Sequence, residues 1–235
     1  MFFVHEAASN GNVFSGVLDA LANDGHRPVA FDLPGHGRTG GLDSLGDISA
    51  MADYTKSLAD QLGLSRPILV GEGMGAAVVL ECAAAHPDWP TALVLCGGAS
   101  ATPAPPAAEV DQLRLVTSGR GRRQFDQTGY APDTGRDVYQ RAFAEWMKTD
   151  PRATIGDLDA LVTWGASDRI ARVVAPVTVV VGEHEPDEPG IALTGLVKTG
   201  RVVRLPAAGR RGALEQPAAL AAIISAAVSA AGNNR

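Results

Sequence analysis

The chain lacks the features that mark several large classes of protein. Its two cysteines, Cys82 and Cys96, can form at most one bridge and do not have the spacing of metal ligands, so neither a disulfide framework nor a metal site is expected. Lys and Arg number 20 against 26 Asp and Glu, and this net charge of −6 disfavours nucleic acid and anionic lipid as partners. The first apolar run, residues 1–4, is too short for a signal peptide, and the longest, 217–231, is too short for a membrane span. We therefore expect a cytoplasmic protein with no membrane partner, whose oligomeric state the sequence leaves open.

Short apolar runs alternate with stretches of helical periodicity along most of the chain. With 46% hydrophobic residues in 235, the chain can bury a substantial core. The runs end in polar or glycine residues, as buried parallel strands do, and the stretches between them carry apolar residues at spacings of three and four. This alternation predicts a parallel sheet with helices on both faces. The expected strands are 2–5, 28–32, 67–70, 92–96, 177–181 and 201–205, and the expected helices include 13–21, 48–62, 74–85 and 215–231.

A proline-rich break at 101–106 interrupts the alternation, and residues 107–165 show helical periodicity without convincing strands. We predict a core formed by 1–100 and 166–235, with 101–165 as a mostly helical cap, called the cap segment below. Half of the chain's Phe, Tyr and Trp residues lie in it, which favours an apolar pocket wall and a hydrophobic ligand; packing of the cap onto the sheet is the alternative explanation. The expected wall residues are Phe125, Tyr130, Trp146 and Trp164.

The sharpest strand-to-helix turn is Gly71-Glu72-Gly73-Met74-Gly75, where glycines permit a tight, strained backbone. It does not have the G-x-G-x-x-G spacing of a dinucleotide site, and no acidic residue ends a strand about twenty positions on. The turn resembles the nucleophile elbow of the α/β-hydrolase family. Four more segments resemble parts of this family, in the order that the family has along the chain. Residues 3–7 resemble the oxyanion turn, 30–39 the D-x-P-G-x-G-x-S loop, 177–186 the segment that carries the triad acid, and 208–217 the segment that carries the triad histidine.

The resemblance implies an α/β-hydrolase fold, with a mostly parallel sheet of about six strands, helices on both faces and a helical cap. It also places unusual residues at the catalytic positions. Gly73 stands where the family has its serine nucleophile, Arg210 where it has the histidine, and Glu185 where it has the acid. Glu6 replaces a glycine of the oxyanion turn, beside the backbone N–H groups of Ala7 and Met74 that the resemblance identifies as oxyanion donors.

Without a serine and a histidine at these positions, hydrolysis through an acyl-enzyme is disfavoured, because removing either residue from a triad enzyme lowers its rate by orders of magnitude. Our leading hypothesis is a cofactor-independent enzyme performing acid–base chemistry, of cyclase, lyase or isomerase type, on a small hydrophobic carbonyl compound such as a polyketide. The resemblance supports this hypothesis, because members of the family that lack the triad include lyases, cyclases and isomerases of secondary metabolism. The expected catalytic groups are Glu6, Glu72, Glu185 and Arg210.

Two other functions stay open at this point: a non-catalytic ligand-binding pseudo-hydrolase, and a hydrolase in which Glu72 or Glu185 activates water directly. Arg210 could also simply pair with Glu185. Of the remaining polar residues, His5 is expected to be a scaffold residue and His36 to be exposed. The basic run Arg120, Arg122 and Arg123 reads as a solvated face, with guidance of an anionic substrate as the alternative.

Overall fold

The computed structural model describes residues 1–103, 107–165 and 167–232. Its centre is a six-stranded sheet of order β2-β1-β3-β4-β5-β6 in which every neighbouring pair is parallel, as predicted. Strand β3 continues beyond the expected end at residue 70, so Glu72 is its last residue. The strands are β1 (Phe2–Val4), β2 (Val29–Ala30), β3 (Ile68–Glu72), β4 (Ala92–Cys96), β5 (Val177–Gly182) and β6 (Gly200–Leu205).

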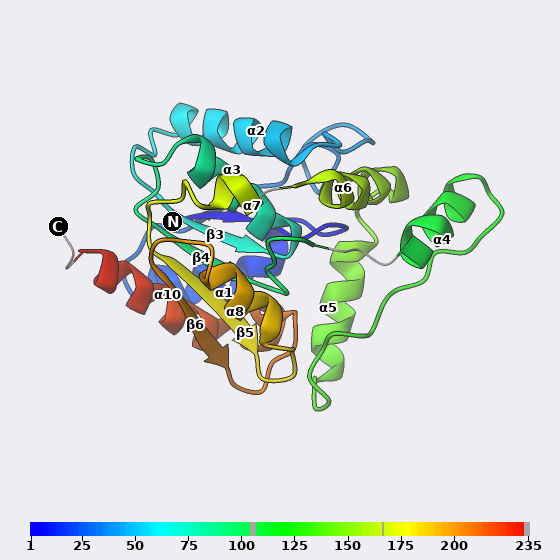
Figure 1. The fold of residues 1–235 in the computed structure, drawn as a ribbon. Helices are drawn as coiled ribbons and strands as arrows, with labels where there is room; N and C mark the ends of the chain where they lie inside the picture. Colours follow the sequence, from blue (N-terminus) through cyan, green and yellow to red (C-terminus); the bar gives the residue numbers. More distant parts are fainter. Residues whose placement is uncertain (104–106, 166, 233–235) are drawn as a thin grey trace.

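Helices cover both faces of this sheet (Figure 1). On one face, α3 (Met74–Ala85) packs against the strands and α2 (Ile48–Gln61) packs on α3; on the other, α1 (Ser15–Asn23) packs against α10 (Pro217–Gly232). A short 3₁₀ helix, η1 (Gly11–Phe14), precedes α1. Alternate residues of the strands supply the two faces. Leu69 and Leu93 belong to the core under α3, whereas Val70 and Val94 belong to the core under α10, as the period of two in a strand requires.

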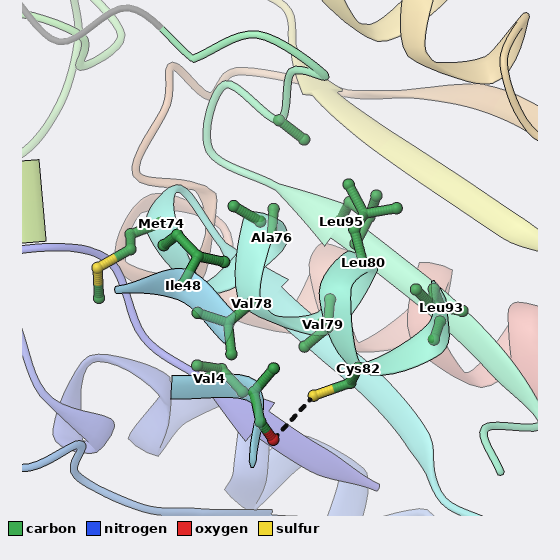
Figure 2. Close-up of a cluster of buried hydrophobic side chains, with 14 of the residues drawn as sticks. Val4, Ile48, Met74, Ala76, Val78, Val79, Leu80, Cys82, Leu93 and Leu95 are labelled. Atoms are coloured by element: carbon green, nitrogen blue, oxygen red, sulfur yellow. Dashed lines mark hydrogen bonds between the residues drawn. The ribbon is translucent and has the colours of Figure 1, made fainter. Parts of the chain in front are cut away.

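The helix that follows the glycine turn is buried almost all round, which explains why it has no polar face. Figure 2 shows Val78, Val79 and Leu80 of α3 among the strand residues Val4 and Leu93. Every residue from Met74 to Ala84 is buried, so α3 is fixed between the sheet and α2. The turn at its start is therefore held by the core of the protein.

The cap segment contains three helices, α4 (Ala107–Thr117), α5 (Arg136–Trp146) and α6 (Pro151–Thr163), and no strand among its described residues. In Figure 1 these helices extend from the side of the sheet opposite the C-terminus. The chain then returns through α7 (Ser167–Ile170) to β5, and α8 (Glu188–Thr194) and α9 (Gly212–Glu215) complete the fold. Within 1–103, 107–165 and 167–232, no helix combines the length and the apolar character of a bilayer-spanning segment. The assignment of the cap segment as a separate cap stays a prediction.

Candidate functional site

The glycine turn has the strained backbone that the sequence predicts. Gly73 is the N-cap residue of α3 and has a φ of 56° and a ψ of −114°, a region that residues with a Cβ rarely adopt. The two flanking glycines have a different role. A Cβ at Gly71 would overlap the Gly75 carbonyl, and a Cβ at Gly75 would overlap the Val4 carbonyl, so both glycines allow β3, α3 and β1 to approach closely.

The Glu6 carboxylate occupies the space in front of this turn. Its Oε1 accepts hydrogen bonds from the backbone N–H of Ala7 (2.9 Å) and from that of Met74 (3.0 Å), the two donors named from the sequence. A Cβ built on Gly73 would overlap both carboxylate oxygens of Glu6. A side chain of the protein itself therefore accepts the hydrogen bonds of both N–H groups and occupies the space beside the tip of the turn.

Two guanidinium groups lie on the other side of the Glu6 carboxylate. Its Oε2 is 3.6 Å from Nη1 of Arg211 and 3.8 Å from Nη2 of Arg210. Arg210 also donates from Nη2 to the Gly97 carbonyl (3.3 Å), and its side chain is half exposed. The carboxylates Glu6 and Glu72 raise the pKa of Arg211, outweighing its burial. Sequence reasoning missed Arg211; its only signal was its place next to Arg210.

Glu185 lines the same site from the turn after β5. Its Oε2 accepts a hydrogen bond from the Gly182 N–H (2.8 Å), and its Oε1 is 4.0 Å from Nε of Arg210. The side chain is 6% exposed, and this burial raises its pKa, partly offset by the Gly182 hydrogen bond and by the charge of Arg210. Arg210 thus contacts Glu185 at the limit of ion-pair distance and lies slightly closer to Glu6.

Glu72 does not face the site, although it was grouped with the catalytic candidates. It is 2% exposed, does not line the cavity described below, and its Oε1 has no hydrogen-bond partner among the described residues. Burial raises its pKa to about 7, against the opposing charge of Arg211. The reason is positional: as the last residue of β3 it precedes the tip of the turn, so its side chain leaves in another direction.

A cavity of about 880 Å³ opens above these groups and reaches into the cap segment. Its walls combine the polar groups Glu6, Glu185, Arg210 and Arg211 with apolar side chains of the cap segment. The apolar part is formed by Leu113, Phe125, Trp146, Leu158 and Leu161. Enclosure by apolar walls with a few convergent polar groups is the usual construction of a small-molecule site.

Two of the four predicted wall residues lie elsewhere. Tyr130 stacks against Tyr139, with ring centroids 4.7 Å apart, and Trp164 donates from Nε1 to Glu81 (3.0 Å) at the base of the cap segment. Neither lines the cavity, whereas Phe125 and Trp146 do. Composition identified an aromatic-rich segment but could not decide which rings turn inward.

The two histidines near the site have structural partners. His5 Nε2 accepts from the Leu33 N–H (3.1 Å), Nδ1 lies 2.8 Å from the Glu6 carbonyl, and burial lowers its pKa to about 4. His36, expected to be exposed, is instead buried, with Nε2 2.8 Å from Oδ2 of Asp157 on α6. That prediction was wrong because the partner comes from a helix 121 residues away. Among the described residues, no group of three or more His, Cys, Asp or Glu side chains could hold a metal ion.

Comparisons with known proteins agree with this architecture. The model of the family described as "Alpha/beta hydrolase family" matches residues 1–223. A protein of Rhizobium rhizogenes with the provisional name carbamate hydrolase RutD is 37% identical over 187 residues, which cover 75% of this chain and 70% of that protein. A 2-hydroxy-6-oxononadienedioate/2-hydroxy-6-oxononatrienedioate hydrolase of a Pseudomonas species is 26% identical over 73% of this chain, which spans only 64% of that relative.

Among solved structures, a thermophilic esterase from Thermogutta terrifontis superposes with a TM-score of 0.85, covering 98% of this chain and 89% of the esterase. The two sequences are 21% identical, so this likeness is one of fold. These two relatives are named for hydrolytic reactions, whereas the residue at the tip of the glycine turn of this chain is Gly73.

Proposed function

This chain belongs to the alpha/beta hydrolase family, and we propose that within it the protein is a ligand-binding member that has given up acyl-enzyme hydrolysis. In this proposal Gly73, Arg210 and Glu185 stand at the positions of nucleophile, histidine and acid. The ligand is a small, largely apolar carbonyl compound bound in the cavity. A cytoplasmic location is part of the same proposal.

One observation supports this function most strongly: the Glu6 carboxylate accepts the hydrogen bonds of the Ala7 and Met74 N–H groups. In acyl transfer, such a pair of donors stabilises the negative charge that develops on the carbonyl oxygen. A carboxylate already bound there both occupies the donors and repels a second anion. Since Gly73 also offers no nucleophile, and Arg210 stays protonated at ordinary pH, neither attack nor proton abstraction by the family's usual route is supported.

A second candidate is acid–base chemistry on the bound ligand, with Glu185 as the proton-transferring group. The observation that favours it is that Glu185 lines the cavity and that its burial raises the pKa of the carboxyl group. A carboxylate shifted in this direction is better suited to proton transfer near neutral pH than an exposed one. Lyase, isomerase or cyclase reactions belong to this candidate, as does direct activation of water.

The test is binding and turnover measured on the same preparation. Calorimetry with small aromatic ketones, esters and carboxylates should detect binding, and a panel of nitrophenyl esters should show no turnover above the rate in buffer. Leu161→Trp, which projects a larger side chain from α6 into the cavity, should weaken binding. Val162→Trp is the matched control, because the neighbouring Val162 is 62% exposed and does not line the cavity.

Different outcomes separate the candidates. Ligand binding that Leu161→Trp weakens and Val162→Trp leaves unchanged, without turnover, supports the ligand-binding function. Consumption of a ligand that is lost in Glu185→Gln while binding persists would replace it with the acid–base enzyme. Ester hydrolysis that depends on Glu185 would establish direct water attack, and binding equally strong in Leu161→Trp would show that the cavity is not the site.

A further inference from the structure

A partly buried guanidinium group in the cap segment has no role in the site described so far. Arg123 lies between α4 and α5 and lines the cavity, unlike Arg120 and Arg122, which are exposed and do not line it. Its Cζ lies 3.9 Å from the ring centroid of Trp146, and its Nη2 donates to the Trp146 carbonyl (2.8 Å). The side chain is therefore held in place by stacking and by one hydrogen bond.

Most of the hydrogen-bonding capacity of Arg123 is unused. A guanidinium has five N–H donors, and the described residues accept from only one nitrogen, Nη2. Its Nε is buried without a partner among them, and so is the hydroxyl of Thr154, a second cavity-lining residue that is 2% exposed. Two polar groups that line the cavity thus have no partner within the described part of the protein, which is costly unless water or a ligand satisfies them.

No carboxylate of the described residues neutralises Arg123. The one charged group that acts on its pKa besides burial is Asp150, and Asp150 is already paired with Arg152 at 3.2 Å. The four acidic residues that line the cavity form no ion pair with Arg123 within 4.0 Å; these are Glu6, Glu109, Asp126 and Glu185. The cavity therefore has a cation on its cap wall without a matching anion, whereas the cations on its floor, Arg210 and Arg211, already lie near Glu6.

We propose that Arg123, positioned by Trp146, forms an anion-binding subsite on the cap wall of the cavity and selects ligands that carry a carboxylate at one end of an apolar body. The planar guanidinium fits a carboxylate with two parallel hydrogen bonds. The apolar body would lie against Leu113, Leu158 and Leu161, which line the same cavity. This inference rests on the proposed function, since it names the ligand class of the same cavity.

The test compares a carboxylate with its neutral amide, 4-phenylbutanoate with 4-phenylbutanamide, by calorimetry on the full chain at pH 7.5. We expect the wild type to bind the carboxylate at least about tenfold more tightly, as a bidentate charge-assisted pair provides. Arg123→Gln should reduce this ratio to about one and leave the affinity for the amide unchanged. Arg122→Gln, which alters the exposed neighbour outside the cavity, should leave the ratio as in the wild type.

Each outcome decides the question. Equal affinities of the two compounds in the wild type, or a preference that survives in Arg123→Gln, would overturn the subsite while leaving cavity binding intact. If neither compound binds, the subsite is refuted, and the proposed function is refuted with it only if the ketones and esters of its own test do not bind either. Should Arg123→Gln not fold, Arg123→Lys decides instead: it keeps the charge but loses the planar fork, so we expect a ratio between those of the wild type and one, and an unchanged ratio would refute bidentate recognition.

Discussion

Glu6 and Gly73 should depend on each other, and their dependence can be measured as a coupling free energy. Gly73→Ser introduces a Cβ that overlaps the Glu6 carboxylate, at a residue whose φ is 56°. The backbone strain alone costs about 1–3 kcal/mol. Glu6 must also move, and its loss as acceptor for the Ala7 and Met74 N–H groups adds about 2–3 kcal/mol, because charge-assisted hydrogen bonds to buried donors are lost.

The same serine should be tolerated better once Glu6 is gone. In Glu6→Gly the space in front of residue 73 is empty, so adding Gly73→Ser then costs only the backbone strain. We therefore expect a coupling free energy of about 2–3 kcal/mol between the two substitutions in a double-mutant cycle. Urea unfolding followed by circular dichroism gives the four free energies of unfolding, with an unchanged m-value as the condition for comparison.

Activity provides the second readout of this cycle. Gly73→Ser with Arg210→His introduces a serine and an imidazole at the proposed positions of nucleophile and histidine but leaves Glu6 on the two N–H groups, so this pair should not hydrolyse nitrophenyl acetate. The triple variant with Glu6→Gly should show weak esterase activity. If the cycle is additive within about 0.5 kcal/mol, or if the pair without Glu6→Gly is as active as the triple variant, the reasoning about Glu6 is refuted.

Three further predictions concern buried titratable groups. Burial raises the pKa of Glu72 to about 7, so its ionisation destabilises the fold as pH rises from about 4.5 to 7. Glu72→Gln should therefore raise the free energy of unfolding by about 2–3 kcal/mol more at pH 8 than at pH 5. An equal effect of the substitution at the two pH values would contradict this reasoning. Burial lowers the pKa of His36, but the hydrogen bond and charge of Asp157 raise it by more. The stabilisation that protonated His36 provides is therefore complete below pH 6.5 and is lost as pH rises through the pKa of the folded state. The decrease in the free energy of unfolding between pH 6 and 9, measured by urea unfolding, should be smaller in Asp157→Asn. Burial raises the pKa of the Cys82 and Cys96 thiols, so a thiol reagent should label them only after unfolding, and rapid labelling of the native protein would refute their burial.

The sheet was predictable because its signals are local. Each strand is a short apolar run followed by a helical pattern, and a single arrangement, parallel strands with helices on both faces, buries them all. The strain at Gly73 was predictable for the same reason, since a strand, a glycine turn and a helix follow one another within a few residues. The family match from residue 1 to 223 confirms the fold at the level of the whole chain.

The site was less predictable because its side chains come from distant segments. Sequence reasoning placed Glu6 beside the N–H groups of Ala7 and Met74, but only the coordinates show that its carboxylate binds both. The burial of His36 against Asp157 and the inward position of Arg123 depend on how the cap segment packs, which no local pattern encodes. Rotamers and long-range partners, unlike periodicity, are set by tertiary packing.

Under the proposed function, the glycine at residue 73 and the carboxylate at residue 6 are best understood as one change. With a serine at residue 73, the Glu6 carboxylate could not lie where it does; with Glu6 in this position, a serine would face an occupied pair of donors. Because Gly73 has no Cβ, the Glu6 carboxylate can lie in front of the turn without steric overlap. The two arginines on the other side of Glu6 stabilise its charge, so Glu6, Arg210 and Arg211 form an ionic floor beneath the cavity in which we propose that ligands bind.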